Sequence, residues 1–233
     1  FAFAGKGGVG KTTIASLFIK ALSKEGLNIL AVDCDPAPGL GRFLGIKDSE
    51  SIVPIVEMKD LINERMNVSK GGAFYKLNPL VNDIPEKFAK GTGNVKLIVM
   101  GTVDRGGSGC MCPESNFLKA LMGKLLIDEK ESLVMDMEAG IEHLGRATAA
   151  FVDILFIVAE PNKTSLEVAK KIGKLAGDLK IKKTVVILNK IRNQAEEEFA
   201  KKNLAGLELL GIVTFDEKLL GTGKEDIIED LEK

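Results

Sequence analysis

A glycine-rich run near the start of the sequence has the residue types of a phosphate-binding loop. The run is Gly5-Lys6-Gly7-Gly8-Val9-Gly10-Lys11-Thr12, which matches the pattern GxxxxGK[ST] between a short apolar segment and a helical pattern. Glycines let the backbone curl so that successive N–H groups point at phosphate oxygens, and the following helix adds its positive end. The alternative interpretation is a glycine-rich turn that only opens a helix, and the matching flanks make it the weaker one.

Two side chains of this run are expected to contact the ligand directly. Lys11 is placed to reach the β- and γ-phosphates, and the Thr12 hydroxyl is placed to bind Mg²⁺. The residues predicted to bind nucleotide in this part of the chain are Gly5, Lys6, Gly7, Gly8, Val9, Gly10, Lys11, Thr12 and Thr13.

Aspartates follow two other apolar segments. Asp33 directly follows Ile29–Val32 and Asp35 comes two residues later, while Asp136 directly follows Leu133-Val134-Met135. An aspartate at the carboxyl end of a strand faces the ligand crevice of an open α/β sheet, and Asp136 is predicted to hold Mg²⁺ through water. For Asp33 and Asp35 the alternative is an Asx turn, in which each side chain only bonds its own backbone.

The pair Cys110-Met111-Cys112 lies in a glycine-rich stretch just before a helical pattern. Two thiolates are half of a closed four-ligand site for a soft metal such as nickel or zinc. Because Cys34 lies beside the phosphate region, two chains related by a two-fold axis would complete a Cys₄ site most simply. The alternative is that both are small, partly buried residues of a loop.

Short apolar segments alternate with helical patterns along the whole chain. The helical patterns begin near Lys11, Pro113 and Thr164, and Asp226–Leu231 could form a short terminal helix. This alternation predicts an α/β fold with a doubly wound, mainly parallel sheet flanked by helices. We expect irregular structure over residues 63–95. The predicted strands are Phe1–Ala4, Ile29–Val32, Leu97–Met100, Leu133–Met135, Ile154–Ala159, Val185–Leu188 and Leu210–Val213.

Length and composition describe an ordinary globular chain. Its 233 residues fit a single domain spanning 1–233. Lys and Arg number 32 against 33 Asp and Glu, so charge gives no reason to expect nucleic acid or an anionic membrane as a partner. Three cysteines are too few for a disulfide framework, and no signal peptide is visible, so a reducing, cytoplasmic location is expected.

The string KGGVGKT, in which Lys6 is an additional lysine, resembles the deviant Walker A motif of the MinD/ParA/nitrogenase-iron-protein (SIMIBI) class of P-loop ATPases. That resemblance implies ATP hydrolysis and an ATP-dependent homodimer in which Lys6 reaches the nucleotide of the neighbouring subunit. It further implies that Asp35 orients or activates the attacking water and that Asp33 lies near the Mg²⁺ shell. The catalytic residues predicted in this way are Lys6, Lys11 and Asp35; considered alone, Lys6 is equally a solvated loop lysine.

Other segments resemble the nucleotide-contacting parts of MinD-like proteins. The stretch DMEAGIE after the third aspartate is similar to their DxxAGIE segment, in which Gly140 can offer its N–H to the γ-phosphate and act as a switch. Asn189-Lys190 resembles the adenine-recognition asparagine and its neighbour, and Phe215-Asp216 resembles the adenine-flanking loop. An amide has both a donor and an acceptor for a base edge, but asparagine after a strand is also a common turn former.

The segments GGSGCMCPE, DMEAGIEHLGRAT, AEPN and LAGDLKIKK resemble the CooC-type ATPases that assist nickel insertion during carbon monoxide dehydrogenase maturation. The resemblance extends from Ala4 to about Asp216. It implies a metallochaperone whose cargo, Ni²⁺ or Zn²⁺, binds Cys110 and Cys112 across the dimer. Its client would be a nickel enzyme, either carbon monoxide dehydrogenase or acetyl-CoA synthase. His143 is interpreted as structural or associated with the switch, with a role as a metal ligand as the weaker alternative.

Two rival functions remain at this point. An iron protein that transfers electrons would need a second cysteine just after Asp136, and Met137–Phe151 contains none. A positioning ATPase of the MinD or ParA kind acts on membrane or DNA. MinD-like proteins end in a basic amphipathic helix, whereas Lys224–Lys233 is acidic here and would be repelled by anionic lipid.

Overall fold

The computed structural model describes residues 1–69, 75–102, 112–127, 131–138, 140–141, 149, 151–204 and 206–217. These residues form an eight-stranded sheet with the strand order β3-β4-β2-β5-β1-β6-β7-β8. Every neighbouring pair is parallel except β3 and β4. The strands are β1 (Ala2–Ala4), β2 (Ile29–Asp33), β3 (Lys90–Thr92), β4 (Val95–Val99), β5 (Ser132–Asp136), β6 (Ile154–Ala159), β7 (Lys183–Ile191) and β8 (Glu208–Thr214).

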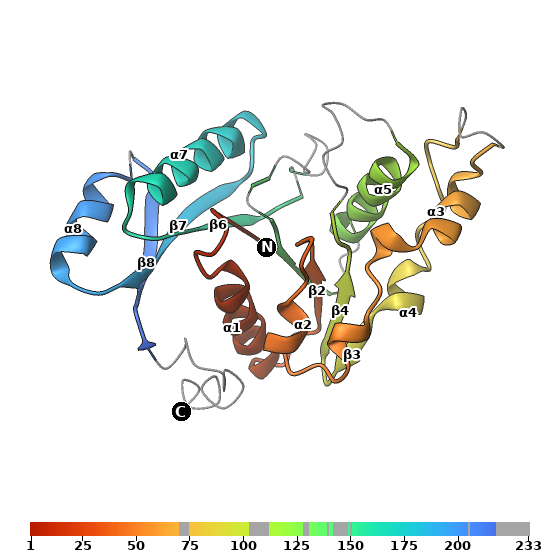
Figure 1. Ribbon diagram of the computed structural model, residues 1–233, viewed down its shortest axis with the longest axis horizontal. Helices are drawn as coiled ribbons and strands as arrows, with labels where there is room; N and C mark the ends of the chain where they lie inside the picture. Colours follow the sequence, from red (N-terminus) through yellow and green to blue (C-terminus); the bar gives the residue numbers. More distant parts are fainter. Residues whose placement is uncertain are drawn as a thin grey trace.

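Helices cover both faces of this sheet, as Figure 1 shows, with α1 and α2 on one side and α5 and α7 on the other. Helix α8 packs beside β7 at one end of the sheet, and α3 and α4 lie near β4 at the other. The helices are α1 (Lys11–Lys24), α2 (Leu40–Phe43), α3 (Lys59–Met66), α4 (Ile84–Phe88), α5 (Pro113–Ile127), α7 (Lys163–Asp178) and α8 (Gln194–Lys202).

The central strands β1 and β2 are buried on both faces, because their successive side chains point in opposite directions and helices cover both sides of the sheet. Phe3 packs with Ile14 and Ile19 of α1 in one core cluster. Its neighbours Ala2 and Ala4 belong to the other cluster, which includes apolar residues of α5 and α7 such as Phe117, Leu121, Leu166 and Ala169. This double burial explains the continuous apolar runs in the sequence, and the predicted doubly wound, mainly parallel α/β fold is confirmed.

The register of the central strands brings their carboxyl ends to the same edge. Phe3 of β1 pairs with Asp136 of β5, and Asp136 pairs in turn with Asp33 of β2. The Cys34 N–H then donates to the Asp136 carbonyl at 2.9 Å and extends the ladder past the two aspartates. As a result, the loop after β1 lies beside both carboxylates, as expected for an open parallel sheet.

All of the predicted strands and the helices beginning near Lys11, Pro113 and Thr164 are present. The prediction of irregular structure over residues 63–95 is wrong at the start of the range, where α3 continues to Met66, and again for its last third. There, α4 is followed by β3 and a turn at Gly93 (φ 56°), and β3 pairs antiparallel with β4 at the edge of the sheet. Residues Lys90-Gly91-Thr92 lack the apolar content that marks a buried strand, since an edge strand needs none. The terminal helix predicted at Asp226–Leu231 lies outside the described residues.

Across the described ranges, no helix is long and apolar enough to pass through a membrane. The acidic segment Lys224–Lys233, on which the expectation of no lipid binding depends, lies outside the described residues.

Candidate active site

The loop between β1 and α1 contains two glycines, Gly5 and Gly10, at positions where the backbone leaves no room for a side chain. Gly5 has φ 149°, and a Cβ there would lie 2.2 Å from the Val158 carbonyl oxygen of β6. Gly10 has φ 93°, and a Cβ there would lie 2.5 Å from the Asn189 side-chain nitrogen. No other residue type fits either position, because both combine a close approach with a conformation that side chains disfavour. The loop can therefore pass tightly against β6 and β7.

Lys11, the first residue of α1, is buried inside this loop with a relative exposure of 6%. Its ammonium donates to the Lys6 carbonyl at 3.5 Å, which is a long hydrogen bond. Among the described residues it has no carboxylate within ion-pair distance. A buried cation with so little compensation is expected to bind an anion at the mouth of the loop.

Asp136 and Thr12 together meet the requirements of a divalent cation. Asp136 is buried, and its Oδ1 has no hydrogen-bond partner among the described residues. Burial raises the pKa of Asp136 to about 7, while a hydrogen bond from the Thr12 hydroxyl and the charge of Lys11 act in the opposite direction. An oxygen ligand that is buried, unpartnered and next to a hydroxyl fits Mg²⁺. When bound, the ion would supply positive charge beside the phosphates.

Asp33 and Asp35 form the two Asx turns that the sequence allowed as an alternative. The Asp33 Oδ1 accepts from the Asp35 N–H at 3.1 Å, and the Asp35 Oδ1 accepts from the Ala37 N–H at 2.9 Å. The Asp33 Oδ2 also accepts from the N–H groups of Gly39 and Leu40, both at 2.9 Å. Burial raises the pKa of Asp33 despite these bonds. Asp33 thus holds the loop before α2, whereas Asp35 is half-buried with one oxygen uncommitted to backbone.

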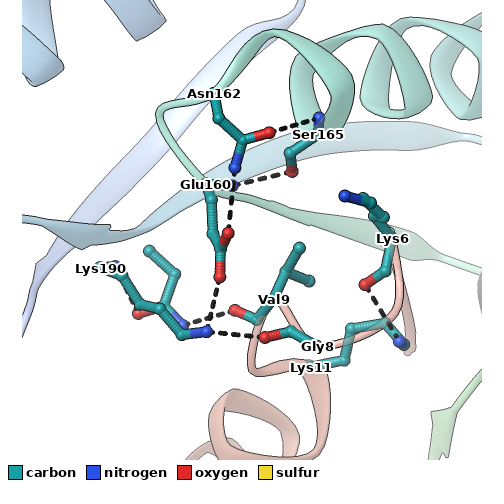
Figure 2. Close-up of polar contacts among 9 residues, drawn as sticks. Lys6, Gly8, Val9, Lys11, Glu160, Asn162, Ser165 and Lys190 are labelled. Atoms are coloured by element: carbon teal, nitrogen blue, oxygen red, sulfur yellow. Dashed lines mark hydrogen bonds and ion pairs between the residues drawn. The ribbon is translucent and has the colours of Figure 1, made fainter.

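Side chains from β7 brace the outer side of the phosphate loop. The Asn189 amide nitrogen donates to the Val9 carbonyl at 2.7 Å, and its oxygen accepts from the Lys190 N–H at 2.9 Å. The Lys190 ammonium donates to the Gly8 carbonyl at 2.6 Å and pairs with Glu160 at 2.5 Å (Figure 2). The structure therefore places both predicted nucleotide residues against the loop, where they bond its carbonyls.

A cavity of about 470 Å³ opens beside this brace. It brings together Lys190 and Phe215, two of the residues predicted to lie near the base, while Asn189 does not line it. The Arg192 guanidinium lies over the Phe215 ring, 4.2 Å from its centroid, as in a cation–π pair. Asp216 is half-buried in the next position. A cavity next to the loop that is lined by charged side chains and an aromatic ring offers room for a base.

Lys6 lies on the exposed side of the loop. Its ammonium donates to the Thr164 hydroxyl of α7 at 3.3 Å, and the side chain is open to solvent. Figure 2 shows Lys6 and Lys190 on opposite sides of the loop, with Lys11 below them. Within the described part of the chain, one long hydrogen bond therefore holds the Lys6 ammonium.

The other predicted residues fall at the edge of the described region. Cys112 immediately precedes α5, and its sulfur accepts from the Ser115 N–H at 3.5 Å. Gly140 is buried close after Asp136. Cys110 and His143 lie outside the described residues, so the structure does not place the second thiolate of the pair. No cluster of three or more His, Cys, Asp and Glu suited to a metal occurs within the described part of the chain.

The fold and this loop define a P-loop nucleotide-binding protein. The family described as the CobQ/CobB/MinD/ParA nucleotide binding domain (CbiA) matches residues 1–226, so the chain belongs to that family. It is an ATPase of this family, for which ATP and Mg²⁺ are the substrate and the cofactor. The resemblance drawn from KGGVGKT is thereby confirmed.

Sequence relatives agree with this assignment. An uncharacterized ATP-binding protein of Methanocaldococcus jannaschii is 46% identical over 94% of this chain and 86% of that protein. The carbon monoxide dehydrogenase accessory protein CooC of Rhodospirillum rubrum is 42% identical over 92% of this chain and 83% of its own length. Among solved structures, the MinD cell division protein of Aquifex aeolicus has a TM-score of 0.62 at 21% identity and covers 94% of this chain and 83% of its own, which shows a shared fold. The chain is a CooC-like ATPase.

Sequence reasoning missed Glu160 and Arg192. Glu160 follows the last apolar residue of β6 and pairs with Lys190, and Arg192 covers Phe215. A polar residue directly after a buried parallel strand was the available signal for Glu160, the same signal that identified Asp33 and Asp136.

Proposed function

We propose that this ATPase is a nucleotide-switched homodimer that assists nickel insertion into a nickel enzyme, with carbon monoxide dehydrogenase as the client. The observation that carries the proposal is the 42% identity to the accessory protein CooC over 92% of the chain. The metal, Ni²⁺ or Zn²⁺, is cargo in this proposal, and ATP hydrolysis drives its transfer.

The chemistry of Cys112 supports a soft-metal cargo. Its sulfur lies at the N-terminus of α5, a helix of 15 residues, where the Ser115 N–H points at it. Backbone N–H groups and the positive end of a helix stabilise negative charge on a thiolate, the form that binds nickel and zinc. With Cys110 two positions earlier, each chain would supply two thiolates, and two chains would complete a four-sulfur site.

The exposed position of Lys6 supports a role in a partner subunit. Among the described residues its ammonium is held by one hydrogen bond, of 3.3 Å, to Thr164 in an open environment, so little energy opposes its release. A lysine that reaches the γ-phosphate of a second copy would stabilise charge that develops during hydrolysis. ATP is then expected to favour the dimer. Lys6→Ala should weaken both nucleotide-dependent dimerisation and turnover, as measured by sedimentation and phosphate release.

Metal stoichiometry tests the proposal. The protein is loaded with Ni²⁺ or Zn²⁺ in the presence of a non-hydrolysable ATP analogue, and metal and oligomeric state are measured together. One ion per dimer is expected in the parent, with loss of binding in Cys110→Ala and Cys112→Ala. Cys34→Ala is the matched control, because this buried thiol lies beside the aspartates and should leave binding unchanged. One ion per monomer, or undiminished binding without Cys110 and Cys112, would refute the shared site.

A client assay and a surface assay separate this proposal from its rivals. Metal-free carbon monoxide dehydrogenase should gain activity faster with the loaded protein and ATP than with free nickel. Sedimentation with anionic liposomes or DNA in the presence of ATP should leave the protein in solution. Nucleotide-dependent cosedimentation without client activation would support a MinD- or ParA-like positioning ATPase instead.

A further inference from the structure

A continuous polar network joins the start of α7 to the phosphate loop. The Glu160 Oε1 pairs with the Lys190 ammonium at 2.5 Å, and the same ammonium donates to the Gly8 carbonyl at 2.6 Å. The second Glu160 oxygen accepts from the Asn162 side-chain nitrogen at 3.0 Å. In Figure 2 the ammonium of Lys190 lies between Glu160 and Gly8. The carboxylate therefore reaches the loop through one lysine.

Helix α7 holds Glu160 in place. Asn162 is its N-cap, and the Asn162 Oδ1 accepts from the Ser165 N–H and the Thr164 hydroxyl, both at 2.9 Å. The Ser165 hydroxyl accepts from the Glu160 N–H at 2.9 Å. Because the helix buries Leu166, Ala169 and Ile172 against the sheet, the network rests on a rigid element.

The contacts on Gly8 and Val9 orient two peptide planes. The Gly8 carbonyl is bonded by Lys190, and the Val9 carbonyl is bonded by Asn189 at 2.7 Å. A trans peptide places its N–H opposite its C=O, and the described residues contain no cis peptide. With both carbonyls turned toward β7, the N–H groups of Val9 and Gly10 must face the opposite side. The Val9 N–H does turn to the inside of the loop, where it donates a long hydrogen bond to the Lys6 carbonyl, with an N···O distance of 3.4 Å.

We propose that Glu160 is a positioning residue of the ATPase site: through Lys190 it fixes the Gly8 carbonyl outward and thereby keeps the Val9 N–H turned to the inside of the loop, where a phosphate oxygen would replace the Lys6 carbonyl as its acceptor. Successive N–H groups that converge on one point form an anion-binding nest, whose affinity depends on their alignment before the ligand arrives. Glu160 also neutralises Lys190, which prevents that ammonium from leaving Gly8 for the ligand. This inference depends on nucleotide binding alone and is independent of any metal cargo.

Glu160→Gln is the direct test, because it preserves the size of the side chain. One of its terminal atoms becomes an amide donor, and that donor must face either the Lys190 ammonium or the Asn162 amide, which are both donors. One bond of the network is lost in either orientation. We expect the affinities for Mg·ADP and Mg·ATP to fall together by about tenfold, with kcat changed less than about threefold. Glu160→Asp, which keeps the charge, should recover part of the affinity.

Glu131→Gln is the matched control. It removes the same charge from an ion pair with Lys96 of 2.7 Å, and Glu131 is 25% exposed compared with 24% for Glu160. Glu131 stands at the opposite end of its strand from the site, so its variant should bind nucleotide as the parent does. Equal losses of affinity in the two variants would assign the effect to net charge and overturn the proposal.

A double variant shows whether Glu160 acts through Lys190. Lys190→Met alone should lower nucleotide affinity at least as much as Glu160→Gln, and the double variant should bind no more weakly than Lys190→Met. Binding is measured by titration of the full chain with Mg·ADP, with thermal melts to confirm that each variant is folded. Parent affinity in Glu160→Gln, or losses that multiply in the double variant, would overturn the proposal. A lower melting temperature with unchanged affinity would assign Glu160 a structural role only.

Discussion

The strands on the two sides of β1 carry polar residues at the same edge of the sheet but use them differently. On the β6–β7 side, Glu160, Asn189 and Lys190 bond one another and the loop carbonyls. On the β2–β5 side, Asp136 keeps an oxygen without a partner among the described residues, and burial raises the pKa of both Asp33 and Asp136. The polar groups of the first side therefore bond one another before nucleotide binds, and we propose that a cation completes the second side.

The difference follows from the ligand that each side is expected to bind, which is a phosphate on the β6–β7 side and a magnesium ion on the β2–β5 side. A phosphate nest needs N–H groups held in fixed directions, which hydrogen bonds to the opposite carbonyls supply. A magnesium ion needs carboxylate oxygens that are not already neutralised, and the free energy of their burial is offset only when the ion arrives. We infer that the β6–β7 side sets nucleotide affinity and that the β2–β5 side sets turnover.

Lys11→Ala should have the largest effect, because Lys11 lies between the two sides and serves both. Loss of its ammonium removes the buried positive charge of the loop, and we expect hydrolysis to fall by at least about 100-fold, with most nucleotide affinity lost. Phosphate release and Mg·ADP titration measure the two losses. The variant should still fold, since alanine favours the first turn of α1. Parent turnover in this variant would contradict the placement of the phosphates.

Asp136→Asn should affect the β2–β5 side alone, whereas Lys11→Ala affects both sides. The amide keeps the shape of Asp136 but loses the charge, so magnesium-dependent turnover should fall by about 100-fold while ADP affinity without Mg²⁺ changes little. In the parent, adding Mg²⁺ should raise the melting temperature of the ADP complex, and this increment should vanish in the variant. Without nucleotide or metal, the variant should be at least as stable as the parent, because an unpartnered buried carboxylate is removed. An unchanged magnesium increment would place the cation elsewhere.

The sequence predicted the phosphate loop and the aspartates of the β2–β5 side. It did not predict the Glu160–Lys190 pair of the β6–β7 side. The motif identified the loop, and aspartates at strand ends identified Asp33 and Asp136, because both signals are local in the chain. The pairing of Glu160, directly after β6, with Lys190 of β7 joins residues 30 positions apart in the chain, and no local sequence pattern predicts it. The sequence allowed an Asx turn at Asp33. Only the path of the chain into α2 shows that both carboxylate oxygens of Asp33 accept backbone N–H groups.

Asp33→Ala should mainly lower the stability of the fold, whereas Asp35→Ala should mainly lower the rate of ATP hydrolysis. Asp33→Ala leaves the N–H groups of Gly39 and Leu40 without their acceptor, and we expect a loss of about 2–4 kcal/mol in the free energy of unfolding. Asp35→Ala removes one exposed bond to Ala37 and should cost less than about 1 kcal/mol, while hydrolysis falls sharply with ATP binding retained. Denaturant titration and phosphate release measure both. Full turnover in Asp35→Ala would show that another group acts on the attacking water.

The smallest effect is expected at the N-cap of α7. Asn162 and Asn193 are matched residues, since each caps a helix by accepting a backbone N–H at 2.9 Å, from Ser165 and Glu196 respectively. Replacement of either by alanine should lower the free energy of unfolding by about 1 kcal/mol. Only Asn162 also donates to Glu160, so only Asn162→Ala should loosen the carboxylate that holds Lys190.

We therefore expect Asn162→Ala to weaken Mg·ADP binding by about twofold to threefold, and Asn193→Ala to leave it within error of the parent. Both variants lose one backbone cap bond, and Asn162→Ala also loses its bonds with Glu160 and with the Thr164 hydroxyl. Equal affinities in the two variants would mean that the Glu160 carboxylate is held in place without the hydrogen bond from Asn162. Asn162 would then play no part in nucleotide binding. A loss confined to Asn162→Ala would instead extend the prearranged side of the site from the loop into the first turn of α7.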